Sequence, residues 1–141
     1  MTAMATNLIL LPAFAMAALT ALVWWRMYTM RIGEMKRERV HPQAVALSSQ
    51  MAALLKDTRA ADNFRNLFEL PVLFYVALLI AYVTAQVSVA TLGLAWAFVV
   101  LRYAHSYIHC TYNKVFHRFQ VYVIGGLVLW ALWAVLAVGI L

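Results

Sequence analysis

Four long apolar segments constrain the fold of this chain more than any other feature of its sequence. They cover about residues 7–30, 62–83, 91–112 and 119–141 of the 141-residue chain. At about 1.5 Å per residue, a helix of roughly 20 residues crosses the hydrocarbon core of a bilayer, which is about 30 Å thick. Only 11% of the residues are charged, whereas soluble domains average about 25%. The sequence therefore predicts an all-α integral membrane four-helix bundle, with a single domain over residues 1–141.

The basic residues indicate how these segments are oriented. Lysine and arginine concentrate in two connections, residues 31–61 and 113–118, whereas the connection 84–90 and both chain ends carry none. Basic loops stay preferentially in the cytoplasm. We therefore expect a multi-pass protein of a bacterial inner membrane, with a cytoplasmic loop over 31–61 and both termini on the non-cytoplasmic side. The net charge of +6 follows from this topology, so we expect no nucleic-acid partner.

The second segment opens with polar side chains at a depth where such groups are unfavourable. Spacings of i, i+3, i+4 and i+7 put four of them on one helix face: Asp62, Arg65, Asn66 and Glu69. An ionisable group inside the membrane costs about 2.5–3.5 kcal/mol even on lenient insertion scales. The cluster is therefore expected to face protein, water or a ligand. Pro71 follows directly, and its missing N–H predicts a kink where the helix passes Leu67.

A second polar cluster ends the third segment, on the same side of the membrane as the first. Arg102, His105 and His109 share a helix face at spacings of i, i+3 and i+7. Lys114 and Arg118 follow in the short basic connection to the fourth segment. The two clusters are therefore expected to lie close together at the cytoplasmic end of the bundle.

The charges in these clusters allow two interpretations. Glu69 and Arg102 have opposite charges at similar depths, so a direct ion pair is expected, and such pairs can simply hold the bundle together. However, cations outnumber the carboxylates at this level: Arg26, Arg31, Arg59, Arg65, Arg102, Lys114 and Arg118. Because arginine forks suit carboxylates and phosphates, this surplus predicts an anionic ligand. Other cations of the long connection are expected to contact membrane lipid headgroups: Lys36, Arg37 and Arg39.

Two motifs give the chain a resemblance to a known family. The first is Arg65-Asn66-x-x-Glu69 followed by Pro71, at the start of the second segment. The second is Arg102-x-x-His105, with Arg118 in the connection that follows. With these motifs the chain resembles a bacterial-type member of the MAPEG superfamily, the membrane-associated proteins of eicosanoid and glutathione metabolism. It is similar to the microsomal glutathione transferases and prostaglandin E synthase of that superfamily.

The resemblance implies a homotrimer that binds glutathione, as a cosubstrate, between neighbouring subunits. Glutathione carries two carboxylates, one ammonium and a thiol. The implied binding residues are Arg31, Arg65 and Arg102 for the carboxylates, Glu69 for the ammonium, and also Asn66, His105 and His109. Arg118 is the implied catalytic cation that stabilises the thiolate, with Lys114 as the alternative. The thiolate would attack a lipophilic electrophile or peroxide from the bilayer, as in a glutathione transferase or peroxidase.

Other interpretations of the sequence stay open. One is a MAPEG-like membrane protein that binds glutathione or lipid, or acts as a scaffold, without catalysis. Another is a small four-helix transporter, although Glu69 lies among arginines rather than in a site for cations. His105-x-x-x-His109 has a spacing that metals and haem can use, but no other histidine lies within a segment, so we expect no metal. The first motif can also be matched with Arg59 and Asn63 as its arginine and asparagine, in the spacing Arg59-x-x-x-Asn63. In this second register Asn66 stands where the motif has its glutamate.

Overall fold

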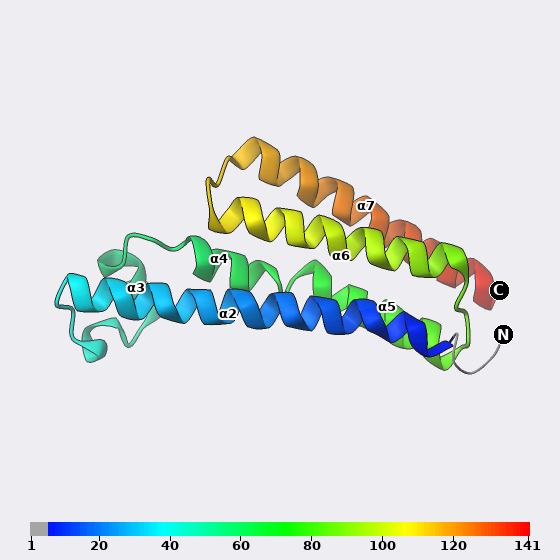
Figure 1. Ribbon diagram of the computed structural model, residues 1–141, viewed down its shortest axis with the longest axis horizontal. Helices are drawn as coiled ribbons and strands as arrows, with labels where there is room; N and C mark the ends of the chain where they lie inside the picture. The colour runs from blue at the N-terminus through cyan, green and yellow to red at the C-terminus, as the bar shows by residue number, and fades with distance from the viewer. Residues whose placement is uncertain (1–5) are drawn as a thin grey trace.

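The computed structural model describes residues 6–141, and this part of the chain is helical, with no β-strand. Four stretches are long and apolar enough to cross a membrane: Leu8–Arg37, Arg59–Val83, Val89–Cys110 and Val115–Ile140. They run side by side as an antiparallel bundle (Figure 1). The protein is therefore an all-α, multi-pass membrane protein, as the four apolar segments predict.

The helices divide these stretches as follows. The first consists of a short 3-10 turn, η1 (Leu8–Leu10), and α2 (Leu11–Arg37). The second consists of α4 (Arg59–Asn66) and α5 (Leu70–Val83), and the last two are α6 (Val89–Cys110) and α7 (Val115–Ile140). The long connection after α2 contains η2 (Pro42–Val45) and α3 (Ser48–Leu54). The polar ends of α4 and α6 lie toward α3, and α2 begins and α7 ends at the opposite end of the bundle (Figure 1).

The first helix continues beyond the end expected from hydropathy. The apolar segment ends near Met30, whereas α2 continues to Arg37. The first strong barrier to a helix in this region is His41-Pro42, because the residue before a proline is disfavoured in the helical conformation. Residues 31–37 therefore project past the apolar part of the bundle and carry the basic side chains with them.

An apolar core holds the bundle together. Phe74 of α5 stacks on Phe98 of α6 with ring centroids 4.5 Å apart, and both side chains are fully buried. The outward faces instead carry exposed apolar side chains, among them Trp25, Val100 and Leu127. Such an exterior suits lipid, because lipid tails are as apolar as these side chains.

The second span is broken between Asn66 and Leu70, which confirms the kink predicted at Pro71. Pro71 lies in the first turn of α5, where its missing N–H leaves no intrahelical hydrogen bond unmade. The break also sets the position of Glu69, which immediately precedes α5. There the carboxylate accepts a hydrogen bond from Asn66 and lies at the positive end of the α5 dipole.

Two arginines from other helices cap the end of α6. Arg26 Nη2 of α2 donates to the carbonyl of Cys110 at 2.9 Å, and Arg59 Nη1 of α4 donates to the carbonyl of Thr111. The last carbonyls of a helix have no partner within it, and a cation there interacts favourably with the helix dipole. These two contacts fix the last turn of α6, which carries His109, relative to α2 and α4.

The turn before α4 is held by carboxylates. Buried Glu34 of α2 accepts a hydrogen bond from the backbone N–H of Lys56 at 2.8 Å. Asp57 pairs with Arg59, with Oδ2 and Nη2 2.6 Å apart. The hydrogen bond from the Arg59 side chain is the main reason that the pKa of Asp57 lies below its usual value of 3.8.

This shift predicts how the stability of the turn depends on pH. Because the folded state lowers the Asp57 pKa, the ion pair stabilises the fold above pH about 4 and loses this effect as the pH falls through the folded-state pKa. We expect Asp57→Asn to lower the melting temperature slightly at pH 7, since the pair is partly exposed. The difference from wild type should shrink under acid conditions. Thermal melts across this pH range test it, and a difference that grows with acidity would contradict it.

Candidate functional site

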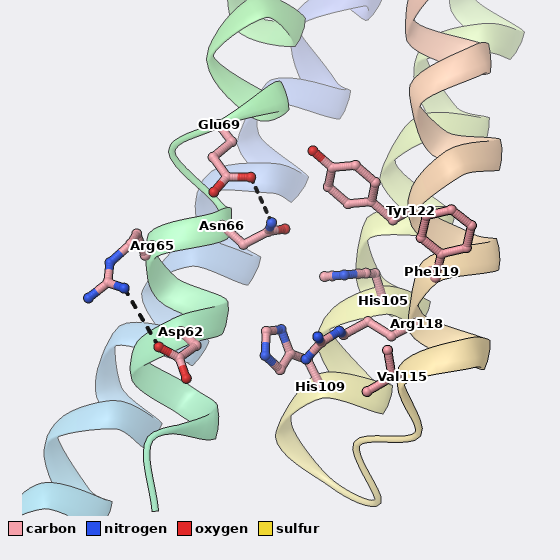
Figure 2. Close-up of a pocket in the computed structure, with 10 residues that line it drawn as sticks. All are labelled: Asp62, Arg65, Asn66, Glu69, His105, His109, Val115, Arg118, Phe119 and Tyr122. Atoms are coloured by element: carbon pink, nitrogen blue, oxygen red, sulfur yellow. Dashed lines mark hydrogen bonds and ion pairs between the residues drawn. The ribbon is translucent and has the colours of Figure 1, made fainter. Parts of the chain in front are cut away.

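A polar cavity of about 320 Å³ lies between the α4–α5 break and the adjoining ends of α6 and α7. Figure 2 shows ten residues around it, projecting from two walls. The first wall, from α4 and the break, contributes Asp62, Arg65, Asn66 and Glu69. The second wall, from α6 and α7, contributes His105, His109, Val115, Arg118, Phe119 and Tyr122. The two polar clusters of the sequence therefore face each other across one cavity.

The α4–α5 wall carries both carboxylates of the cavity. Asn66 Nδ2 donates to Glu69 Oε2 at 2.8 Å, so the amide orients that carboxylate. Asp62 accepts from Thr58 Oγ1 at 2.8 Å, whereas Arg65 Nη1 is 3.7 Å from Asp62 Oδ1. The long Arg65–Asp62 contact is exposed, so Arg65 can exchange it readily for an anionic ligand.

The α6–α7 wall carries the imidazoles and one guanidinium. Arg118 is held from behind by the turn between the two helices, because its Nη1 donates to Asn113 Oδ1 at 2.8 Å. Asn113 has a φ of 48°, a left-handed conformation that asparagine adopts more readily than most residues. In Figure 2 the Arg118 side chain extends toward His109 rather than away from the cavity. The turn sequence thus positions a cation beside the two histidines.

Arg102 does not line this cavity but lies behind it. Its side chain is only 1% exposed and sits between the rings of Phe98 and Tyr122, at 5.3 and 4.9 Å from their centroids. Arg102 Nη1 donates to Asn66 Oδ1 at 2.9 Å. The expected direct ion pair with Glu69 is therefore wrong. The Asn66 amide lies between the two charges, since it can accept from the guanidinium and donate to the carboxylate at once.

The structure brings together six of the nine predicted site residues: Arg65, Asn66, Glu69, His105, His109 and Arg118. Arg102 acts on the cavity only through Asn66. Lys114 directly precedes α7 and does not line the cavity, so Arg118 is the better placed of the two candidate cations. Arg31 lines a different cavity, between α2, α3 and α4. Asp62 and Arg65 line both cavities, so within one subunit Arg31 lies near Arg65 but does not line the cavity that holds Glu69 and Arg118.

Four lining residues were not predicted as site residues: Asp62, Val115, Phe119 and Tyr122. The sequence contains a signal for them. Val115, Arg118, Phe119 and Tyr122 have spacings of i, i+3, i+4 and i+7, which is the same one-face pattern that marks Asp62 to Glu69. The apolar character of α7 hides this pattern, because Arg118 is its only charged residue.

Arg59 and Asn63, the residues of the second register of the first motif, hold helices together and do not line the cavity. Asn63 is completely buried, and its Nδ2 donates to Cys110 Sγ at 3.4 Å. Ser106 Oγ donates to Asn63 Oδ1 at 3.3 Å. Asn63 therefore ties α4 to α6 beneath the cavity, while Arg59 caps α6. The later register, which contains Asn66 and Glu69, is the one that faces the cavity.

Four spanning stretches around a polar cavity near one end define a helical, multi-pass membrane protein with chemistry-bearing side chains inside the bundle. The MAPEG family model matches residues 9–138, nearly the whole chain, so the protein belongs to the MAPEG family. The match confirms the family resemblance that the two motifs indicate. No curated protein and no solved structure gives a match to the chain.

Proposed function

We propose that the protein binds glutathione in the cavity between α4–α5 and α6–α7 and activates its thiol against a lipophilic electrophile. The observation that carries this proposal is the uneven distribution of charge across the cavity. The α4–α5 wall carries both carboxylates and one cation, Arg65, while Arg118 and the two histidines lie on the other wall. A ligand with an ammonium and a carboxylate at one side and a thiolate at the other fits such a cavity, and glutathione has these groups.

The individual groups of glutathione have partners among the lining residues. Its ammonium suits Glu69, which Asn66 already orients, and Asp62 on the same wall. A carboxylate suits Arg65, whose contact with Asp62 is long and exposed. The thiol then lies toward the opposite wall, where Arg118 lowers the pKa of a nearby thiol by stabilising the thiolate. Arg102 supports this arrangement indirectly, since it holds Asn66.

The second substrate is expected to come from the lipid. Val115 and Phe119 line the cavity, and more than half of each side chain is exposed on the surface of α7. A polar cavity with an apolar rim on a spanning helix lets a lipophilic molecule approach the sulfur without crossing water. The same thiolate serves a transferase, which forms a C–S bond with an electrophilic carbon, and a peroxidase, which reduces an O–O bond.

Family membership also supports a proposal about assembly and location. We propose that three copies form a homotrimer in a bacterial inner membrane, with the glutathione site at the cytoplasmic side and near a subunit boundary. The partly exposed Arg65 and Val115 would then be covered by a neighbouring copy. Cross-linking of the protein in its native membrane followed by mass measurement tests this proposal, and a monomer under all conditions would contradict it.

The charge distribution predicts the effect of neutralising Glu69. Glu69→Gln keeps the shape of the side chain but removes the charge that pairs with the ammonium. Hydrogen bonds to charged groups contribute about 1.5–3 kcal/mol, so glutathione affinity should fall by roughly 10–100-fold. Calorimetric titration of the detergent-purified protein with glutathione measures this change. The matched control is Glu38→Gln, which removes an exposed carboxylate paired with Arg37 outside the cavity.

Three outcomes of this titration separate the candidate functions. Binding by wild type, lost in Glu69→Gln and kept in Glu38→Gln, supports the proposed site. No binding by wild type at millimolar glutathione would overturn the proposal. Binding without conjugation of any electrophile would favour a non-catalytic MAPEG protein instead.

A further inference from the structure

Two buried histidines in the cavity wall each have a ring nitrogen without a hydrogen-bond partner in the part of the chain that the structure describes. His105 is 3% exposed and His109 is 6% exposed, and the Nδ1 atom of each is buried without a partner among residues 6–141. Leaving a buried polar group unsatisfied costs about 1–3 kcal/mol, so such groups are rare and call for an explanation. Neighbouring buried polar side chains in the same layer, Asn63 and Ser106, do have partners. Arg102 Nη2 and Trp133 Nε1 are also buried without a partner within the described residues, but of these four atoms only the two imidazole nitrogens belong to residues that line the cavity.

The charged groups around the two rings differ. His105 lies within the influence of two guanidiniums, those of Arg102 and Arg118. His109 lies between Arg118 on α7 and the Asp62 carboxylate on α4. In Figure 2 the His109 ring projects from α6 toward the α4 wall, beside the Arg118 side chain. A proton on His109 would therefore meet a carboxylate as well as a cation, whereas a proton on His105 would meet only cations.

Other cations near the end of α6 are engaged elsewhere. Arg26 of α2 and Arg59 of α4 donate to the carbonyls of Cys110 and Thr111. His109 lies in the last turn of α6, where the helix dipole also favours a positive charge. No side chain in the part of the chain that the structure describes pairs with its Nδ1 atom, so the neutral imidazole is available to accept a proton.

We propose that His109 is the catalytic base that accepts the proton of the glutathione thiol, beside the cation that stabilises the resulting thiolate. The proposal rests on the function proposed above and assigns one further step of it. The S–H bond breaks, the proton goes to an imidazole nitrogen, and the electron pair stays on sulfur next to Arg118. With an aryl chloride as electrophile, that pair forms the C–S bond and chloride leaves with the C–Cl electrons. The imidazolium then releases its proton to water, which returns His109 to its starting state.

The test is the pH profile of conjugation with 1-chloro-2,4-dinitrobenzene, with the uncatalysed rate subtracted. In wild type the rate should change little at neutral and alkaline pH and fall only where His109 itself becomes protonated. General base catalysis contributes about 10²–10⁴-fold, so His109→Gln should be at least about 100-fold slower at pH 7. Its rate should then rise with pH up to the pKa of the bound thiol, which Arg118 keeps below the value of about 8.5 for a free thiol.

A matched control and a binding measurement make this result decisive. His117→Gln removes an imidazole in the first turn of α7 that does not line the cavity, and its profile should equal that of wild type. His109→Asn provides a second variant if the glutamine variant does not fold. Glutathione affinity should change little in the folded variants. A His109 variant whose profile is parallel to that of wild type, merely scaled, would overturn the proposal while leaving the proposed function standing. Failure of wild type to bind glutathione would overturn both.

Discussion

Replacing Arg118 by alanine is expected to lower the rate of glutathione conjugation by about 10²–10³-fold, the usual effect of removing one group that stabilises a developing anion. Arg118 is the only cation on the α6–α7 wall of the cavity, and Asn113 fixes its guanidinium at 2.8 Å. Because the other binding contacts lie on the opposite wall, glutathione affinity should fall much less than the rate. Steady-state kinetics with glutathione and a model electrophile, together with calorimetry, separate the two effects.

Lys114→Ala is the matched control for this prediction. Lys114 lies only four residues before Arg118 but does not line the cavity. Its removal should therefore leave the rate close to that of wild type. The reverse result, with a slow Lys114→Ala and an active Arg118→Ala, would transfer the catalytic assignment to Lys114. Equal activity in all three proteins would remove the assignment altogether.

Replacing Arg102 by alanine is expected to have the largest effect on stability. The side chain is almost completely buried between Phe98 and Tyr122, and it provides the donor for Asn66 Oδ1. Alanine would leave a cavity between the two rings and would remove the donor to the half-buried Asn66 Oδ1. Large-to-small changes in a core cost about 2–5 kcal/mol, which corresponds to a melting-temperature decrease on the order of 10 °C. Thermal unfolding in detergent measures this change.

Two further variants establish that the loss comes from the site of Arg102. Arg102→Met fills most of the same volume without the charge, so it should restore much of the stability, since a buried charge is itself costly. It should not restore glutathione affinity, because Asn66 and Glu69 lose the contact that orients them. Arg37→Ala, at an exposed position on α2, should melt as wild type does. If Arg102→Ala also melted as wild type does, Arg102 would not hold the wall as described.

The sequence predicts the membrane fold and the meeting of the two polar clusters for a simple reason. Charged side chains are so unfavourable in lipid that their positions on apolar helices must correspond to a shared interior surface. The spacing of Asp62 to Glu69 and of Arg102 to His109 therefore carries three-dimensional information. Pro71 likewise predicts the break in the second span, because the loss of its N–H is a local property of the chain.

Other features depend on geometry that spacing alone does not contain. Charge favours a direct pair between Arg102 and Glu69, but the amide of Asn66 has both a donor and an acceptor and lies between them. Arg31 belongs to the same basic set by composition, yet α2 places it in an adjoining cavity that shares only Asp62 and Arg65 with the candidate site. Tyr122 has the spacing of a lining residue, but an uncharged ring on an apolar helix gives no sign of which face is internal.

We propose that the protein holds glutathione as a thiolate, and the ultraviolet absorbance of the bound thiolate tests this most directly. Difference spectra are recorded at neutral pH as glutathione is added to wild type and to Arg118→Ala. We predict a saturable thiolate band in wild type, with the midpoint given by calorimetry, and a much weaker band in the variant although it still binds. Binding of glutathione to wild type with no thiolate band, or an equal band in both proteins, would contradict the role given to the cavity.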